Sequence, residues 1–376
     1  MSIRRRPGSA LLACGMALAS VWAGPAGAAG DLLLASATSC TKSDAPQADV
    51  PQGDDELSPP NLSGPTRIGM AFRVLEIRDI DPVQGSYSLR GYVRTSWCDR
   101  RLAFDADEQG VDERVYVGPA ADARLGKTVW FPSAFPVNQV GELRVTERVL
   151  RIRHDGTIEQ DMNIVVPLST HFDLRRFPFD EQTLIMEVES FVFSAEQVVL
   201  VDDAARTGFD PSLQLPEWTL HSVVGRVADA PVMRSREPHS RYQLEIRIGR
   251  KPGFYLWKVF LPLVIIVALS WSVFWMPEEK FASRSRISAT GVLTIVAYQF
   301  AFGADLPRVG YLTLLDKTMI ASFGLLAVTV LESLLISPWQ TTHPDRALRV
   351  DQISRLLFPG AYLVMLTLIF GVARVD

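Results

Sequence analysis

Four apolar segments follow one another in the last third of the chain, after a longer region of short alternating runs. Each segment has, or nearly has, the roughly twenty residues that a helix needs to cross a bilayer. The pattern predicts membrane-spanning helices at about residues 254–276, 282–303, 311–336 and 355–373. We therefore expect residues 253–376 to form an all-α, four-helix transmembrane domain.

The region before these segments has the pattern of a β-sheet protein. Between residues 66 and 252, short runs of alternating or β-branched residues, such as Tyr87 to Trp97, are broken by turn signals, such as His154-Asp155-Gly156. Many short strands with this punctuation are typical of a sandwich of two sheets. We expect an all-β, immunoglobulin-like sandwich of about ten strands.

The N-terminal residues have the composition of segments that are not part of a folded domain. Three arginines, an apolar run and a group of small residues predict a secretory signal peptide over residues 1–29. Residues 30–65 are rich in Asp, Ser, Pro and Gly, which predicts a flexible leader. The signal peptide would export the sandwich, and basic residues such as Lys280 and Arg346 would keep the first and third loops between spans in the cytoplasm.

Composition adds little beyond this, because the net charge is only −4. Of the three cysteines, Cys14 falls within the expected signal peptide. Cys40 and Cys98 would lie on the exported side, where a disulfide persists, although the polar, proline-rich surroundings of Cys40 favour two free thiols. No metal ion or other cofactor is expected, because the cysteines and the five histidines lack ligand spacing.

The second predicted span carries polar residues along one face. Steps of four and three residues from Arg286 reach Thr290, Leu293, Ala297 and Phe300, which is one stripe on a helix. An ionisable group at membrane depth is costly and usually faces water or the interior of a bundle. The stripe therefore predicts a functional face, which a helix that only anchors the chain in lipid would not need.

Five motifs occur in order between Arg67 and the C-terminus. They are Trp97-Cys98-Asp99-Arg100-Arg101-Leu102-Ala103-Phe104-Asp105, Phe172-Asp173-Leu174-Arg175-Arg176-Phe177-Pro178-Phe179-Asp180-Glu181-Gln182, Arg250-Lys251-Pro252-Gly253-Phe254-Tyr255, Ser270-Trp271-Ser272-Val273-Phe274-Trp275 and Leu306-Pro307-Arg308-Val309-Gly310-Tyr311. Together they resemble the pentameric ligand-gated ion channels, the Cys-loop receptor superfamily. Animal members bracket the second motif with two cysteines, but the matching positions here are Thr170 and Leu184, as in the cysteine-free prokaryotic branch.

The resemblance implies a ligand-gated ion channel made of five identical subunits. It would lie in the bacterial inner membrane as a multi-pass protein, with the sandwich and both mature termini on the periplasmic side. Its partners would be the lipid bilayer, permeant ions and a small-molecule agonist of unknown identity. Each stripe residue would become a ring of five, with Leu293 forming an apolar constriction and Phe300 narrowing the outer mouth.

The sign of the permeant ion depends on the start of the same helix. Rings of arginine attract anions, and rings of acidic residues attract cations. Cation-conducting members commonly have a glutamate just before the residue that matches Arg284, but Ser283 stands there. The resemblance therefore implies an anion-selective pore, with Arg284 and Arg286 as selectivity residues. Pairing of these arginines with Glu278 and Glu279 would leave a cation-selective pore as the alternative.

The resemblance also implies a ligand site and a coupling region. The family's agonist site lies between neighbouring sandwiches and is walled by aromatic residues, which favour cationic amines. The matching positions are Trp97, Trp130, Phe135, Phe191, Phe193, His239 and Tyr242. Coupling between sandwich and pore would run through loops at the membrane surface and include an ion pair of Arg250 with Asp180 and Asp81. The matching positions are Asp81, Pro178, Phe179, Asp180, Arg250, Pro307 and Arg308.

Other classes of function find less support in the sequence. The chain has no phosphate-binding glycine loop, no Gly-x-Ser-x-Gly elbow and no His-Glu-x-x-His helix, so we do not expect an enzyme. A nucleic-acid partner is not expected either. A membrane-anchored receptor that binds a ligand without conducting remains the alternative of another class, but it would not require the polar stripe.

Overall fold

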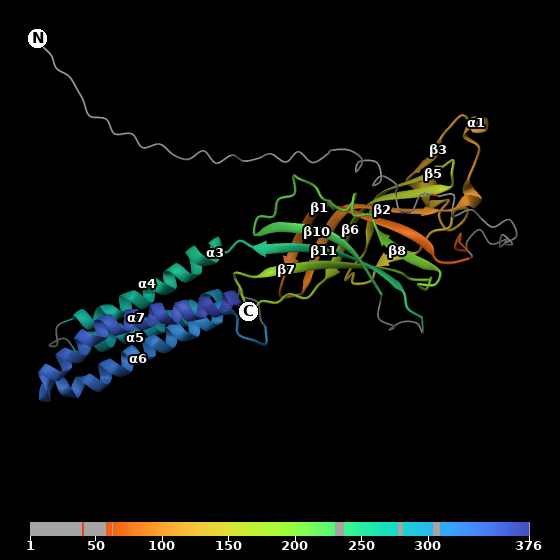
Figure 1. The fold of residues 1–376 in the computed structure, drawn as a ribbon. Helices are drawn as coiled ribbons and strands as arrows, with labels where there is room; N and C mark the ends of the chain where they lie inside the picture. The colour runs from red at the N-terminus through yellow and green to blue at the C-terminus, as the bar shows by residue number, and fades with distance from the viewer. Residues whose placement is uncertain are drawn as a thin grey trace, which may run out of the picture. The chain divides into compact units, whose positions relative to one another are not determined.

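The structure, a computed structural model, describes residues 40, 58–61, 63–229, 237–276, 281–303 and 309–375. Strands occupy the first part of this range and long helices the second (Figure 1). The strands are β1 (Thr66–Asp81), β2 (Ser86–Cys98), β3 (Glu113–Val117), β4 (Ala134–Pro136), β5 (Arg144–Arg153), β6 (Thr157–Ser169), β7 (Glu181–Ser190), β8 (Val198–Asp202), β9 (Gly208–Phe209), β10 (Trp218–Asp229) and β11 (Ser240–Arg250). The predicted order of a β-sandwich followed by helices is therefore confirmed.

Two sheets make the sandwich. The larger has the strand order β3-β5-β6-β2-β1-β8, with β9 also pairing with β1, and the smaller has the order β10-β11-β7-β4. Successive residues of a strand point to opposite faces of its sheet, and β11 accordingly buries every second residue from Tyr242 to Ile248. The buried faces contribute to one hydrophobic core. Short helical segments, η2 (Arg100–Leu102), α1 (Ala106–Gln109) and α2 (Pro119–Asp122), connect the strands.

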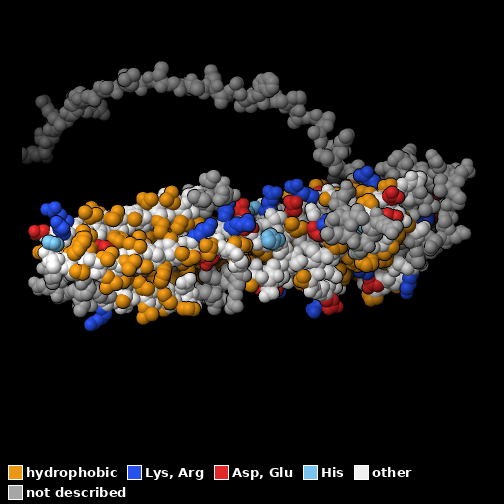
Figure 2. Space-filling view, turned by 90° about the horizontal axis from the view of Figure 1, so that it is seen from below, with side chains coloured by type: hydrophobic (Ala, Val, Ile, Leu, Met, Phe, Trp, Pro, Cys, Tyr) orange, Lys and Arg blue, Asp and Glu red, His pale blue; other side chains and the backbone are white. Residues whose placement is uncertain are grey.

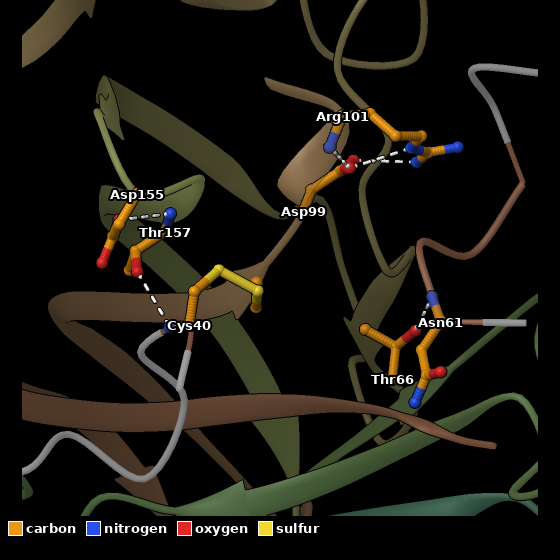
Figure 3. The surroundings of a disulfide bond; sticks show 8 residues. Cys40, Asn61, Thr66, Asp99, Arg101, Asp155 and Thr157 are labelled. Carbon is orange, nitrogen blue, oxygen red and sulfur yellow. Dashed lines mark hydrogen bonds and ion pairs between the residues drawn. A yellow bond between two sulfur atoms is a disulfide. The ribbon is translucent and has the colours of Figure 1, made fainter. Parts of the chain in front are cut away.

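Cys40 and Cys98 form a disulfide, with their Cα atoms 5.1 Å apart, so the expectation of two free thiols is wrong (Figure 3). Cys98 ends β2 and lies opposite Thr157 of β6. The Oγ1 atom of Thr157 accepts a hydrogen bond of 3.1 Å from the backbone N–H of Cys40. These contacts hold Cys40 beside Cys98, although the composition around Cys40 predicts a flexible leader. Residues 1–39, which include the expected signal peptide, lie outside the described residues.

The helical part has four long segments within the described residues. The first is a run of α3 (Gly253–Tyr255), the π-helical turn η3 (Leu256–Phe260), α4 (Leu261–Ser270) and the 3₁₀ turn η4 (Trp271–Trp275). The other three are α5 (Phe281–Gly303), α6 (Leu314–Thr342) and α7 (Pro344–Val375). They lie alongside one another (Figure 1).

Two helix ends differ from the prediction. Helix α6 continues past Pro338, and α7 begins eleven residues earlier than expected. Pro338 removes one backbone donor from α6, but the helix closes four residues later, where the N–H of His343 donates to the carbonyl of Trp339 at 2.7 Å. Pro344 then starts α7 at the first helical position, where its missing donor is not needed. Arg346, which was expected in the loop between the third and fourth spans, therefore lies on α7.

Three of the helical segments are long and apolar enough to cross a membrane, namely Gly253–Trp275, Leu314–Ile336 and Pro344–Gly371. Helix α5 has a shorter apolar stretch, Ala289–Phe300. Figure 2 shows hydrophobic side chains gathered over the helices on the face in view. The second of the four predicted spans is thus the least apolar, because it carries the polar stripe.

Candidate functional site

The residues of the predicted stripe lie along one exposed face of α5. Arg286, Thr290, Leu293, Ala297 and Phe300 are all exposed. The exposed fraction is 69% for Leu293 and 80% for Phe300, although both are large hydrophobic residues. The stripe therefore faces away from the other helices of the same chain.

The opposite face of α5 is packed against its own chain. Ile295 is only 2% exposed. A Cβ atom added to Gly291 would lie 2.2 Å from the Oγ atom of Ser270 on α4, so a larger residue here would require the Ser270 side chain to move. Small residues allow helices in membranes to approach closely. Packing of this face fixes the direction of the stripe.

Two threonine hydroxyl groups on α5 are bonded to the helix itself. The Oγ1 of Thr290 donates to the carbonyl of Arg286 at 2.8 Å, and the Oγ1 of Thr294 donates to the carbonyl of Thr290 at 2.8 Å. These threonine oxygens keep lone pairs that can accept hydrogen bonds from water. The side chain of Arg284 lies outside the described residues, as do Glu278 and Glu279.

Four of the seven predicted ligand residues lie close together in the structure. The rings of Trp97 and Trp130 meet edge to face with centroids 6.0 Å apart, and Trp130 lies 5.4 Å from the ring of Phe193. The Nδ1 of His239 lies 3.0 Å from the carbonyl oxygen of Phe193. Trp97, Trp130 and His239 are buried within the chain, so they present no open surface there.

Two other predicted ligand residues are exposed and lie on neighbouring segments. Phe135 is on β4 and pairs in register with Glu189 of β7, whereas Phe191 directly follows β7. The backbone N–H of Phe191 donates to the carbonyl of Ser133, just before β4, at 2.9 Å. β4 and the end of β7 therefore present two exposed rings on adjacent segments.

Tyr242 lies apart from both groups, in the core of the sandwich. Its ring stacks on that of Phe72, with centroids 5.7 Å apart. Its hydroxyl donates to the Oδ1 of Asp202 at 3.0 Å. Burial raises the pKa of the Tyr242 phenol above its ordinary value. Within the subunit, Tyr242 therefore packs the core and is not exposed beside Phe135 and Phe191.

The expected ion pair between Arg250 and Asp180 is present and buried. The Nε of Arg250 lies 2.8 Å from the Oδ1 of Asp180, and its Nη2 lies 3.2 Å from Oδ2. The guanidinium also lies over the rings of Trp218, at 4.1 Å, and Phe177, at 4.9 Å. Gln182 donates a further hydrogen bond of 2.7 Å to Asp180. Removing one partner of such a pair leaves a buried charge, which typically costs about 3–5 kcal/mol.

Asp81 does not join this pair in the structure. Its Oδ1 accepts hydrogen bonds from the backbone N–H groups of Val83, at 2.8 Å, and Gln84, at 3.0 Å. Asp81 thus stabilises the turn between β1 and β2. Pro307 and Arg308 lie outside the described residues.

The segment from Phe172 to Asp180 contacts three of the long helical segments. The backbone N–H of Leu174 donates to the hydroxyl of Tyr311 at 2.9 Å, and the N–H of Leu314 at the start of α6 donates to the carbonyl of Arg175 at 3.0 Å.

Aromatic rings make the remaining contacts of this segment. Phe177 lies 4.7 Å from Tyr255 of α3, and Phe179 lies 5.7 Å from Phe370 of α7. Pro178 lies between these two phenylalanines. The segment thus has direct contacts through which the sandwich can act on the helices.

A network of charged residues on β2, β5 and β6 was not predicted from the sequence. Arg94 binds Asp161 through two hydrogen bonds of 2.6 and 2.9 Å, and Arg151 also donates to Asp161. Arg153 donates to Glu159 at 3.0 Å. The signal in the sequence is the period-two spacing of charges in two strands, Arg151 and Arg153 in β5 and Glu159 and Asp161 in β6.

The network perturbs the ionisation of its members. Burial acts to raise the pKa of Asp161, but the hydrogen bonds and charges of Arg94 and Arg151 outweigh it and hold the pKa below its ordinary value. The hydrogen bond to Asp161 raises the pKa of Arg94. Both side chains therefore stay charged at neutral pH and hold the three strands together.

Comparison with known proteins identifies the family. A family model described as neurotransmitter-gated ion-channel ligand binding domain matches residues 51–252. The gamma-aminobutyric acid receptor subunit beta-4 of Gallus gallus is 27% identical over 281 residues, which are 73% of this chain and 55% of that protein. The chain thus spans about half the length of the curated relative that it matches.

The family match covers the strands of the sandwich and both partners of the Arg250–Asp180 pair, and it extends over more than half of the chain. Members of this family are ion channels and not enzymes, as the sequence led us to expect. The chain therefore belongs to the neurotransmitter-gated ion-channel family, through a ligand-binding domain that precedes its helices.

Proposed function

We propose that the protein is a subunit of a homopentameric ligand-gated ion channel whose pore is lined by α5. Family membership and the similarity to a gamma-aminobutyric acid receptor subunit support a gated channel. The observation that carries the proposal is the exposed stripe of α5, because it contains Arg286 and Thr290 as well as apolar residues. A charged and hydroxylic face at membrane depth is stable against water and costly against lipid.

In a ring of five subunits, the stripe gives the pore an order along its axis. Arg286 forms a basic ring near the cytoplasmic end, and Thr290 forms a hydroxylic ring one turn further out. Leu293 forms a narrow apolar ring that blocks ions by dewetting, and Phe300 narrows the outer mouth. Basic rings attract anions, so the pore selects anions over cations.

Agonist binding in this proposal takes place between neighbouring sandwiches. The rings of Phe135 and Phe191 support this location, because both are exposed and lie on adjacent segments of the same sheet edge region. The buried group of Trp97, Trp130, Phe193 and His239 supports the wall behind them. Aromatic faces of this kind bind small molecules, with a preference for those that carry a positive charge.

Coupling runs from the segment around Asp180 to the helices. The buried Arg250–Asp180 pair supports this path, because it joins the end of the last strand to the segment that contacts α3, α6 and α7. Arg250→Glu would place two negative charges together in a buried position, and we expect it to abolish gating. Normal assembly and gating of Arg250→Glu would remove the pair from the coupling path.

The proposed setting is the bacterial inner membrane. The absence of cysteine between residues 170 and 184 supports the prokaryotic branch of the family. In this topology residues 1–29 are a cleaved signal peptide, and the sandwich and both mature termini are periplasmic. Arg346 and Arg349 at the α6–α7 junction support a cytoplasmic position for that junction.

A recording of the purified protein in planar bilayers tests the proposal. The Leu293→Ser variant makes the test independent of the agonist, because a hydroxyl at the constriction admits water and should open the pore spontaneously. With asymmetric potassium chloride across the bilayer, we expect a reversal potential near the chloride equilibrium potential. Reversal at the potassium equilibrium potential would show a cation channel. Absence of current, together with ligand binding, would instead support a receptor that does not conduct.

A further inference from the structure

The first span is irregular at one turn, and the cause lies in the sequence. Pro262 is near the start of α4 and has no backbone N–H, so the carbonyl of Lys258, four residues earlier, loses its normal helical donor. The chain responds with the π-helical turn η3, in which the N–H of Leu261 bonds to the carbonyl of Leu256, five residues earlier. The carbonyl of Lys258 is therefore open to a donor from another element.

Tyr298 of α5 provides such a donor. Its hydroxyl oxygen lies 3.1 Å from the carbonyl oxygen of Lys258 and 2.7 Å from that of Val259. In the membrane interior an unsatisfied carbonyl costs several kcal/mol, so this hydroxyl stabilises the irregular turn. The hydroxyl has one proton for two acceptors on adjacent residues, and it can therefore change acceptor with a small movement of the turn.

The same turn is in contact with the coupling segment. Phe260, the last residue of η3, lies 5.6 Å from the ring of Phe370, which in turn lies 5.7 Å from Phe179. Tyr255, the residue before η3, lies 4.7 Å from Phe177. Movement of the coupling segment thus reaches η3 through packed rings.

The contact on α5 is close to the constriction. Tyr298 follows Leu293 by five residues, which is about 7.5 Å along a helix. The two side chains point to different sides, because Leu293 is on the exposed stripe and Tyr298 is turned towards the first span. A displacement of the part of α5 that carries Tyr298 would therefore move the Leu293 constriction without changing its side chains.

We propose that Tyr298 is a positioning residue, through which movement of the π-helical turn η3 sets the position of the gate on α5. This role rests on the proposed channel function. The hydroxyl bonds to the Lys258 or the Val259 carbonyl according to the position of the turn, and α5 follows. Tyr298 does not touch the permeating ions, so it affects the probability that the pore is open and leaves conduction through the open pore unchanged.

The test is Tyr298→Phe, which removes only the hydroxyl, recorded in the Leu293→Ser background. A hydrogen bond contributes about 0.5–1.5 kcal/mol, so we expect the ratio of open to closed times to change by roughly two- to tenfold. The unitary conductance and the reversal potential should stay the same. A merely structural residue would lower the amount of folded protein and would not change gating at constant conductance.

Tyr362→Phe is the matched control. The hydroxyl of Tyr362 on α7 lies 3.1 Å from the Oγ of Ser322 on α6, so this variant also removes a hydroxyl that joins two helices, but not at α5. We expect its open probability to equal that of the background. Equal changes in Tyr362→Phe and Tyr298→Phe would show a general loss of packing and would overturn the proposal.

Pro262→Ala provides a second test, because it restores the backbone donor for the Lys258 carbonyl. If the hydroxyl acts through this turn, Tyr298→Phe should have a smaller effect in the presence of Pro262→Ala, and the two changes should not be additive. Full additivity, or an unchanged open probability in Tyr298→Phe, would reject the role of Tyr298 alone. Absence of current in the Leu293→Ser background would reject the channel itself, which is a different result.

Discussion

Two faces of the helical part are equally exposed and chemically different. Leu293 on α5 is 69% exposed, and Leu335 on α6 is 72% exposed. The exposed neighbours of Leu293 on α5 include Thr290, Thr294 and Ala297, whereas those of Leu335 on α6 include Leu331, Leu334 and Trp339. Exposure in one subunit therefore does not identify the surrounding medium, but the composition of the face does.

The contrast extends along both faces. Large exposed hydrophobic residues are spread along α6 and α7, which suits contact with lipid chains. They are Ile320, Phe323, Val328, Leu331, Leu334, Leu335, Trp339, Leu348, Ile353, Leu356, Leu357, Leu363, Val364 and Leu368. The α5 face adds Arg286, Thr290 and Thr294, which lipid cannot hydrate. In the proposed channel the two faces meet different solvents, lipid on α6 and α7 and water on α5.

Serine substitution of one leucine on each face should produce the largest difference in gating between the two faces. Leu293→Ser should raise the spontaneous open probability by roughly tenfold or more, because hydrating one leucine side chain costs about 1.5–3 kcal/mol. Leu335→Ser, at equal exposure, should leave gating unchanged. Single-channel recording measures both. Equal effects of the two variants would mean that the α5 face is not the pore wall.

Alanine substitution of two exposed arginines sharpens the comparison further. Arg286→Ala should lower the chloride-to-potassium permeability ratio by roughly fivefold or more, because a charge at 4 Å contributes about 1 kcal/mol even in water. Arg346→Ala, on the first turn of α7, removes an arginine that is also exposed but not on the stripe. Its permeability ratio should match that of the parent. The reversal potential under asymmetric chloride gives both ratios, and a shift in Arg346→Ala alone would contradict the assignment.

Charges in the sandwich should affect stability and not conduction, in contrast to Arg286. Asp161→Asn should lower the free energy of unfolding by about 1 kcal/mol at neutral pH, because it weakens the hydrogen bonds from Arg94 and Arg151. The native pKa of Asp161 lies below that of the unfolded chain, so its contribution is present above about pH 4 and is lost as the pH falls through the native pKa.

The difference between native protein and Asp161→Asn should therefore shrink in acid. Denaturant unfolding at a series of pH values measures it. Glu142→Gln is the control, because Glu142 forms a pair of 3.7 Å with Arg144 in which both side chains are largely exposed. This control should change stability little at any pH. A gap for Asp161→Asn that stayed constant into strong acid would show that the carboxylate charge is not the cause.

The sequence predicted the fold class and the stripe because both depend on local periodicity. The alternation of buried and less buried residues in β11, and the steps of four and three residues on α5, can each be recognised from residues close together in the sequence. The Arg250–Asp180 pair was predicted only through the resemblance to a family, since the two residues are 70 positions apart.

Other features depend on contacts that no local pattern records. The disulfide depends on the fold, which places Cys40 beside both Cys98 and Thr157, whereas the composition around Cys40 indicates only flexibility. The contact of Tyr298 with η3 depends on how two helices pack, although Pro262 already signals an irregular turn. At Pro338 the sequence predicted a helix end that the structure does not have. A helix that continues past a proline loses one backbone hydrogen bond and keeps the others.

Thiol modification of single cysteines tests most directly whether α5 faces water. Thr290→Cys and Ala297→Cys place a thiol on the stripe, and Leu335→Cys and Leu357→Cys place one on the lipid face of α6 and α7. Because a thiol reacts as the thiolate, which needs water, a charged, membrane-impermeant reagent should modify the two stripe cysteines in the open channel and change its current. The two lipid-face cysteines should stay unmodified. Modification of Leu335→Cys and Leu357→Cys with protection of Thr290→Cys and Ala297→Cys would contradict a pore lined by α5.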